Sequence, residues 1–190
     1  MKDQFLTRKI VFIAIVVSVS ACLQVFADSF IYWQAGFFKE FWRIWTGHWG
    51  QVGWIHFPLN MLAFACLPFI FPRVKVWHFV ALLVLLPLFI SLCFYYFFPD
   101  IEAYAGLSGV LHGAYVTVAC VHLLYKKERN FAAFVLFLIL AKLIWENTLG
   151  SVGTAELIGS PVLVESHLLG VIGGVIIAMF YILWDYFFEQ

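Results

Sequence analysis

Charged residues are scarce in this sequence. Only 12% of its 190 residues are charged, 64% are hydrophobic, and the mean hydropathy is +0.97. Soluble domains carry about 25% charged and about 50% apolar residues, so this composition excludes a soluble globular protein and indicates an integral protein of the lipid bilayer. The 11 basic and 11 acidic residues cancel, so nucleic acid is not a predicted partner.

Cysteines are also few, and they are scattered. Cys22, Cys66, Cys93 and Cys120 each lie within an apolar stretch. Their spacing fits no metal-binding motif and no disulfide framework, so we interpret them as buried packing residues. The sequence therefore predicts no metal site and no cofactor.

Long polar segments are missing too, so we expect a single membrane domain over residues 1–190. A membrane-spanning helix needs about 20 mainly apolar residues. The predicted spans are residues 10–27, 56–71, 76–98, 104–125, 131–149 and 162–188. The predicted fold is therefore an all-α bundle of six transmembrane helices. For the first stretch, a cleaved signal peptide ending near Ala27 is the alternative to a retained helix.

Two connecting segments have distinct compositions. Residues 28–55 are rich in tryptophan and phenylalanine, and tryptophan concentrates at the headgroup level of a membrane. This segment predicts a loop lying partly in the membrane interface between the first two helices. An ordinary aromatic belt leaves its polar side chains unexplained, namely Arg43, Thr46, His48 and Gln51. Residues 150–161, with glycines and small polar residues, predict a plain loop.

The distribution of lysine and arginine predicts the orientation. These residues concentrate before the first span, between the second and third, and between the fourth and fifth. Because these segments alternate along the chain, they lie on one side, and the positive-inside rule makes that side cytoplasmic. Both termini are then cytoplasmic. Ser108 and His167 lie at matching depth near the outer ends of their spans.

Glycines at i, i+4 spacing form one strip in each of two spans, Gly109 with Gly113 and Gly170 with Gly174. Small residues at this spacing let two membrane helices approach closely. If the strips face each other, Ser108 and His167 meet inside the membrane. A hydroxyl within hydrogen-bond reach of an imidazole base is the arrangement that nucleophilic acyl transfer needs, so the sequence predicts a serine hydrolase.

The other histidines have several interpretations. His56 and Asn60, also at i, i+4 spacing, can donate hydrogen bonds to a developing negative charge. They can equally just bridge two helices. His78 and His122 lie near the cytoplasmic ends of their spans, and we interpret both as structural.

The acidic residues of the sequence do not indicate a third catalytic member beside Ser108 and His167. Lys142 and Glu146 form an i, i+4 pair in the fifth span, which we interpret as structural charges that reach toward the membrane surface. Glu165 is two residues from His167 and therefore lies on another helical face. The sequence thus predicts a Ser-His dyad, with His112 as a candidate to orient His167.

These motifs resemble those of one family. Gly106-Leu107-Ser108-Gly109 resembles the Gly-x-Ser-Gly motif of the rhomboid intramembrane serine proteases. His167-Leu-Leu-Gly170-Val-Ile-Gly-Gly174 resembles their His-x-x-Gly-x-x-x-Gly helix. Phe41-Trp42-Arg43, Thr46 and His56-Phe-Pro-Leu-Asn60 are similar to their first outer loop and second helix, in the same order.

The resemblance implies roles for individual residues. Ser108 would be the nucleophile and His167 the general base. The oxyanion hole and its support would come from His56, Asn60, Gly106, Leu107, His112 and the Ser108 backbone N–H.

The resemblance also concerns the loop, where Trp42 and Arg43 would hold the segment against the bundle. Two positions depart from the family. Gln51 stands where many rhomboids carry a loop histidine, and His112 stands where they often have a tyrosine packed on the catalytic imidazole.

The phrase Leu-Ser-Gly-Val-Leu-His-Gly and the stretch Phe-Trp-Arg…Thr-Gly-His are similar to the rhombosortase subgroup. This likeness implies a protease of the bacterial inner membrane whose active site opens to the outer side. Its substrates would be exported proteins anchored by a C-terminal tail with a glycine-glycine motif, a hydrophobic helix and basic residues. The alternatives are a rhomboid protease for other single-span proteins, a non-catalytic rhomboid-like binding protein, and a histidine-rich haem or quinone carrier.

Overall fold

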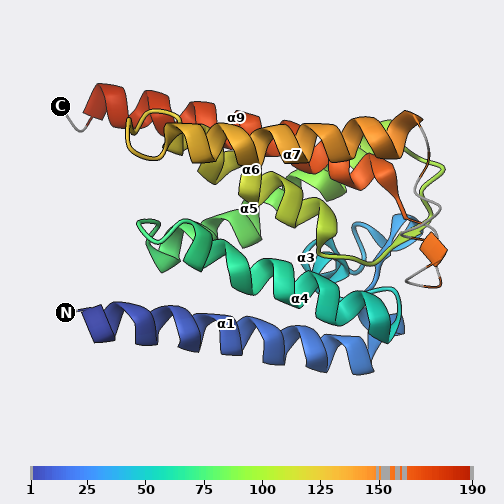
Figure 1. The fold of residues 1–190 in the computed structure, drawn as a ribbon. Helices are drawn as coiled ribbons and strands as arrows, with labels where there is room; N and C mark the ends of the chain where they lie inside the picture. Colours follow the sequence, from blue (N-terminus) through green and yellow to red (C-terminus); the bar gives the residue numbers. More distant parts are fainter. Residues whose placement is uncertain (1, 149, 151–154, 157–158, 160–161, 189–190) are drawn as a thin grey trace.

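The computed structural model describes residues 2–148, 150, 155–156, 159 and 162–188. Most of them are helical, and the long helices run side by side (Figure 1). The elements follow in the order α1 (Lys2–Val25), α2 (Ala27–Phe30), β1 (Tyr32–Trp33), η1 (Gln34–Gly36), α3 (Arg43–Trp49), α4 (Gly53–Ile70), α5 (Val76–Phe97), β2 (Ala103–Tyr104), α6 (Ser108–His122), α7 (Arg129–Thr148) and α9 (Val164–Phe188). The loop predicted over residues 150–161 lies largely outside the described residues, as does residue 149.

Within the described residues, five helices are long and apolar enough to cross a membrane, namely α1, α4, α5, α7 and α9. Together with the composition they indicate a multi-pass membrane protein. The remaining predicted span corresponds to α6, which has 15 residues and a length of about 23 Å, less than the hydrocarbon core of about 30 Å. The count of six spans therefore stays a prediction. The start of α1 and the end of α9 lie at one end of the bundle, and α3 lies toward the other (Figure 1).

The helix α6 begins at Ser108, later than the predicted start at Tyr104. The cause is a short antiparallel pairing of β1 with β2, in which Tyr32 lies opposite Tyr104. Residues in a β-ladder have extended backbone and cannot at the same time be helical. The Gly106 N–H then donates to the carbonyl of Gly47 at 3.1 Å. This two-stranded sheet is absent from the all-α prediction, and it sets the position of Ser108.

The segment between α1 and α4 is folded rather than irregular. The Arg43 guanidinium donates to the carbonyls of Asp28 at 3.0 Å and Ile31 at 2.9 Å. The Thr46 hydroxyl donates to the carbonyl of Phe30 at 2.7 Å. These contacts attach α3 to the chain that follows α1. The placement of this segment in a membrane interface stays a prediction.

His48 attaches α3 to α5. Its side chain is fully buried, and its Nε2 lies 2.9 Å from the Ser91 hydroxyl, which donates to the carbonyl of Ile44. Burial lowers the pKa of His48 to about 3, so the imidazole is neutral near pH 7. One of the polar residues that an aromatic belt leaves unexplained is therefore a buried structural link.

Lys9 joins α1 to the end of α4. Its ammonium group is buried and donates to the carbonyls of Pro68 at 2.6 Å and Pro72 at 2.8 Å. The last carbonyls of a helix have no intrahelical partner, and they attract a positive charge. The Pro68 carbonyl is one of these groups, and the lysine gives it a partner, while the Pro72 carbonyl just after the helix accepts from the same ammonium group.

Candidate active site

The helices α6 and α9 touch backbone to backbone. A methyl group on Gly109 would lie 2.6 Å from the carbonyl oxygen of Ser166, and one on Gly113 would lie 2.5 Å from that of Gly170. Neither position has room for a side chain. The Thr117 hydroxyl adds a bond of 3.0 Å to the carbonyl of Gly174. The two glycine strips of the sequence therefore face each other.

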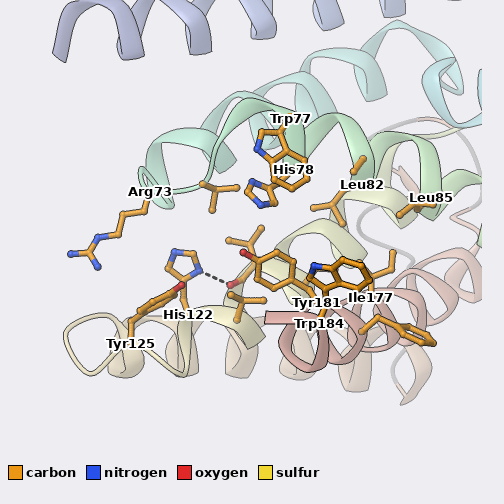
Figure 2. A pocket seen from close by; sticks show the side chains of 16 residues that line it. Arg73, Trp77, His78, Leu82, Leu85, His122, Tyr125, Ile177, Tyr181 and Trp184 are labelled. Atoms are coloured by element: carbon orange, nitrogen blue, oxygen red, sulfur yellow. Dashed lines mark hydrogen bonds between the residues drawn. The ribbon is translucent and has the colours of Figure 1, made fainter. Parts of the chain in front are cut away.

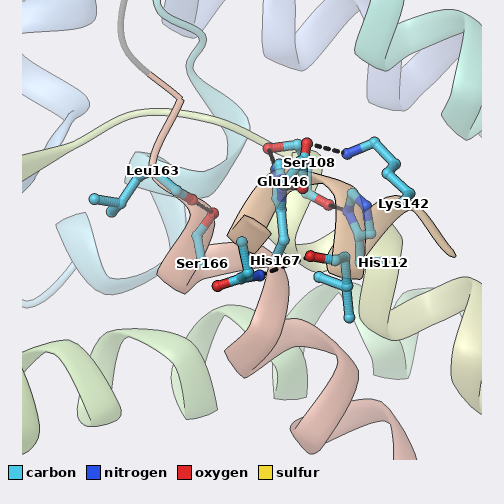
Figure 3. A network of polar contacts seen from close by, with 9 residues as sticks. Ser108, His112, Lys142, Glu146, Leu163, Ser166 and His167 are labelled. Atoms are coloured by element: carbon cyan, nitrogen blue, oxygen red, sulfur yellow. Dashed lines mark hydrogen bonds and ion pairs between the residues drawn. The ribbon is translucent and has the colours of Figure 1, made fainter. Parts of the chain in front are cut away.

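This contact brings Ser108 and His167 together. Ser108 is the first residue of α6, and His167 lies in the first turn of α9. The Ser108 Oγ lies 2.9 Å from the His167 Nε2 (Figure 3). The imidazole is buried, with 3% of the residue exposed, and the serine is half-buried. The distance lies within the usual range for a hydrogen bond from a hydroxyl to a ring nitrogen.

Ser108 and His56 line two cavities. One has a volume of about 470 Å³ and is also lined by Gln51 and Tyr104. The other has a volume of about 280 Å³ and is also lined by His167. A group bound in either cavity can reach the serine.

Gln51 organises the other polar groups near the start of α6. Its Oε1 accepts a hydrogen bond from the Asn60 amide and one of 3.3 Å from the Leu107 N–H. Its own N–H donates to the Gln24 side chain at 2.7 Å. Gln51 therefore links α1, α4 and α6, and it anchors the loop at the position where the sequence departs from the rhomboid pattern. The Leu107 N–H, which the resemblance predicts to support the oxyanion hole, instead donates its hydrogen bond to the Gln51 side chain.

The chain just before Ser108 is held by Tyr104. Its hydroxyl donates to the carbonyl of Gly106 at 2.6 Å, and burial raises the pKa of Tyr104, so it remains a neutral donor. A methyl group on Gly106 would lie 3.5 Å from the His56 ring. His56 and Gly106 are thus neighbours; His56 lines both cavities, and Asn60 lines the smaller one.

His112 lies on the face of the His167 ring. The ring centroids are 4.2 Å apart and the ring planes differ by 22°. The His112 Nδ1 lies 2.7 Å from the Ser108 carbonyl. His112 therefore occupies the place where the resemblance puts an aromatic ring, and it restricts tilting of the His167 imidazole.

Trp42 and Arg43 differ in how firmly they hold the loop. Arg43 makes the carbonyl contacts described above and pairs with Glu40. Trp42 is 41% exposed, and its Nε1 lies 3.5 Å from the Ser29 carbonyl, which is too long for a strong hydrogen bond. The structure therefore ties the loop through Arg43 rather than Trp42.

Glu146 is the residue that the sequence analysis misinterpreted. It comes from α7, it is 5% exposed, and its Oε2 accepts a hydrogen bond of 2.8 Å from the His167 Nδ1 (Figure 3). Its Oε1 accepts one of 2.6 Å from the Lys142 ammonium. A charge reaching toward the membrane surface would be exposed, so the interpretation of Glu146 as such a charge is wrong. The predicted absence of an acidic neighbour of His167 is also wrong.

A signal for Glu146 was present in the sequence. Ionisable residues within membrane spans are expensive and are functional candidates by default. Lys142 and Glu146 satisfy that description. The spacing within α7 shows that they pair with each other, but it contains no information on which residue of another helix they face.

Three potential metal ligands lie close together, since donor atoms of His112, Glu146 and His167 are all within 4.8 Å of one another. Each of these residues already has hydrogen-bond partners, including Ser108 and Lys142. The two imidazole rings are stacked, whereas a shared metal ion must lie in the plane of each ring that binds it. The donor set therefore fits a proton-transfer site better than a metal site.

A separate cavity of about 500 Å³ lies between α5, α6 and α9, away from Ser108 (Figure 2). Its lining is largely aromatic and aliphatic, with Trp77 and Trp184 among the labelled residues. His122 lies there, with its Nδ1 2.7 Å from the Val118 carbonyl and its Nε2 3.2 Å from Glu128. These contacts fit the structural role predicted for His122.

Comparisons with known proteins assign the family. The family model of the rhomboid domain matches residues 39–184, which is more than half of the chain. A comparison with curated proteins found no match. Members of the matched family are generally intramembrane serine proteases, and the match covers residues 39–55 of the loop, Ser108 and His167. The chain belongs to the rhomboid family.

Proposed function

We propose that this protein is an intramembrane serine endopeptidase in which Ser108 is the nucleophile and His167 is the general base. The observation that supports this most directly is the 2.9 Å contact between Ser108 Oγ and His167 Nε2 beside two cavities. A serine with an adjacent base is the arrangement that forms acyl-enzyme intermediates. The rhomboid domain supports the same reaction class.

In the proposed reaction, the Ser108 oxygen attacks the scissile carbonyl while its proton passes to the His167 Nε2. The negative charge that develops on the carbonyl oxygen is stabilised by hydrogen-bond donors. The candidates are His56, Asn60 and the Ser108 N–H, because the first N–H groups of a helix lack intrahelical partners. His167 then protonates the leaving amine. Water attacks the acyl group, with His167 again accepting the proton, and Ser108 is restored.

For the substrate we propose exported proteins with a C-terminal tail of a glycine-glycine motif, a hydrophobic helix and basic residues. The support is the likeness of Leu-Ser-Gly-Val-Leu-His-Gly to the rhombosortase subgroup. The cavity of about 470 Å³ lined by Ser108 provides space for an unwound segment of such a tail. Glycines let a substrate helix unwind so that a peptide bond is exposed.

The proposed location is the bacterial inner membrane, with both termini cytoplasmic and Ser108 near the outer side. The distribution of lysine and arginine supports this orientation. A basic substrate tail would then remain on the cytoplasmic side while the cleaved protein is released outward.

The decisive experiment is co-expression with a glycine-glycine-tailed protein, followed by mass spectrometry of the new C-terminus. We expect cleavage near the glycine pair in the wild type and none in the folded Ser108→Ala variant. Cleavage that persists in Ser108→Ala would refute the proposal. Equal cleavage of a substrate whose two glycines are replaced by valine would instead favour a rhomboid protease of broader specificity.

The other function classes predict different results. A histidine-rich haem carrier needs two histidines with space for the cofactor between them, whereas His112 and His167 are stacked at 4.2 Å and His48 is fully buried. An absorbance spectrum of the purified protein with a Soret band would support a carrier. A non-catalytic binding protein would not react with a fluorophosphonate probe, while the proposed protease should be labelled at Ser108.

A further inference from the structure

We infer that Glu146 is a positioning residue that holds His167 in the tautomer required for catalysis, and that Lys142 keeps its carboxylate in place. The inference rests on the proposed function and extends it from a dyad to three linked groups. Glu146, His167 and Ser108 come from α7, α9 and α6. The chain of groups linked to Ser108 therefore comes from three helices, where the dyad alone needs two.

The hydrogen bonds form a continuous chain (Figure 3). Lys142 Nζ donates to Glu146 Oε1 at 2.6 Å, and His167 Nδ1 donates to Glu146 Oε2 at 2.8 Å. His167 Nε2 then faces Ser108 Oγ at 2.9 Å. Among the described residues, each Glu146 carboxylate oxygen and each His167 ring nitrogen has one hydrogen-bond partner. The Glu146 side chain is 3% exposed and that of Lys142 is 45% exposed, so the chain runs from an accessible cation to a buried base.

The carboxylate determines which ring nitrogen carries the proton. A neutral imidazole has one N–H donor and one bare nitrogen that accepts. Because an ionised carboxylate only accepts hydrogen bonds, the proton lies on the His167 Nδ1. The Nε2 lone pair is then directed at the Ser108 hydroxyl, which is the state needed for a base.

The same carboxylate stabilises the charge that the reaction creates. When the Ser108 proton moves to Nε2, His167 becomes an imidazolium, and its Nδ1–H remains bonded to the Glu146 carboxylate. Opposite charges at this distance attract strongly in a poorly solvated site. The Glu146 side chain stays ionised throughout, so no proton passes to it. Stacking against His112 restricts tilting of the His167 ring, and the hydrogen bond to Glu146 restricts rotation of the ring within its plane.

Lys142 explains how a buried carboxylate can exist before His167 becomes charged. An unpaired buried charge is strongly unfavourable, and the Lys142 ammonium supplies the compensating charge from one turn away on α7. Lys142 also lines the smaller cavity beside Ser108. A purely structural ion pair would need no third partner, whereas the second oxygen of Glu146 is directed at His167.

The test uses Glu146→Gln in the co-expression and probe-labelling assays. Glutamine has nearly the same shape, but its amide can donate to Nδ1 and thereby favour the tautomer with the proton on Nε2, which cannot accept the Ser108 proton. We expect kcat to fall by about 10²- to 10⁴-fold, the range for loss of a general base, with KM unchanged. Glu146→Asp keeps a carboxylate and should regain part of the activity.

Two further variants separate positioning from simple structure. The double variant Lys142→Met with Glu146→Gln should be no slower than Glu146→Gln alone, because Lys142 acts only through the carboxylate; linked residues give such non-additive effects. The matched control is Glu165→Gln, which removes a different carboxylate close to His167 in sequence, one that is half-buried where Glu146 is buried. It should keep wild-type kcat.

Nitrogen NMR of histidine-labelled protein gives a readout that needs no substrate. The signal that His167→Ala removes should report a proton on Nδ1 in the wild type and on Nε2 in Glu146→Gln. A proton on Nε2 in the wild type, or full kcat in Glu146→Gln, would overturn the inference while leaving the protease assignment intact. Failure of the wild type itself to cleave or to be labelled at Ser108 would overturn the proposed function instead.

Discussion

Replacing Gly109 by alanine should strongly reduce the reactivity of the protein without unfolding it. Gly109 follows Ser108 in α6, and the added methyl group would lie 2.6 Å from the carbonyl oxygen of Ser166, the residue before His167. Both atoms in this clash belong to rigid helical backbone next to the reacting side chains. The substitution therefore changes the distance between Ser108, the proposed nucleophile, and His167, the proposed base, without altering either side chain.

The size of the effect follows from that distance. Ordinary van der Waals contact for such a carbon begins at 3.4 Å, so the two backbones must separate by about 0.8 Å. If the side chains follow their backbones, the Ser108–His167 contact lengthens from 2.9 Å to about 3.7 Å, beyond hydrogen-bond range. A misplacement of about 1 Å can reduce rate by about 10²-fold. We expect a loss of that order.

Stability should change much less. Crowding a packed contact costs about 1–3 kcal/mol, but replacing glycine by alanine within a helix gains about 1 kcal/mol. The net change of about 0–2 kcal/mol leaves a folded protein. Thermal unfolding in detergent micelles measures this directly, and the rate of fluorophosphonate labelling at Ser108 measures reactivity without a natural substrate.

Gly173→Ala is the matched control on the facing helix. Its methyl group would lie 2.7 Å from a ring carbon of Phe89, and a half-buried side chain can move where backbone cannot. We expect normal labelling in this variant. If Gly109→Ala were labelled at the wild-type rate, the close helix contact would have no part in holding Ser108 against His167, and the reasoning from the glycine strips would be refuted.

Three further predictions concern the rest of the bundle. Gly170→Val should abolish cleavage, since even a methyl group there would overlap the carbonyl of Gly109; normal turnover would mean that α9 can move aside. Lys9→Met should lower the free energy of unfolding by about 3–6 kcal/mol, because it removes two charge-assisted hydrogen bonds of about 1.5–3 kcal/mol each, and thermal unfolding of the exposed Arg8→Met variant is the control. The lowered pKa of His48, about 3 in the folded state against 6.5 for an unperturbed histidine, means that the unfolded protein binds a proton first as pH falls. Its contribution to stability is therefore complete above pH 6.5 and falls by about 1.4 kcal/mol per pH unit toward pH 3, a slope that should be missing in denaturation curves of His48→Gln.

Much of the bundle is readable from the sequence because apolar length and small-residue spacing are local properties. Five of the six predicted stretches coincide with helices that are long enough to span. The contact between the two glycine strips also follows from a local pattern. Gly109 and Gly170 have no side chains, so the backbone of the other helix can approach each of them closely. That contact brings Ser108 to His167.

The parts that sequence reasoning missed depend on contacts between distant segments. Glu146 is one turn from Lys142, which explains the pair locally, and only the packing of α7 shows that His167 is the other partner. From the sequence, Gln51 only replaces a loop histidine of the family pattern. The structure shows that its side-chain oxygen accepts a hydrogen bond from the Asn60 amide. The late start of α6 has the same origin, because two strand residues far apart in the chain pair just before it.

The position at which α6 begins also explains how so apolar a chain can contain a polar site. Charged groups in a membrane interior are costly and usually face a cavity or the bundle interior. Because Ala103–Tyr104 is held as a strand, α6 begins at Ser108 and leaves the space before it to a cavity of about 470 Å³. A helix continuing back to residue 104 would lose the β1–β2 pairing. The folded segment between α1 and α4, which supplies β1, thus sets the position of Ser108, the proposed nucleophile, against His167 of α9, whose ring is bonded to Glu146 of α7.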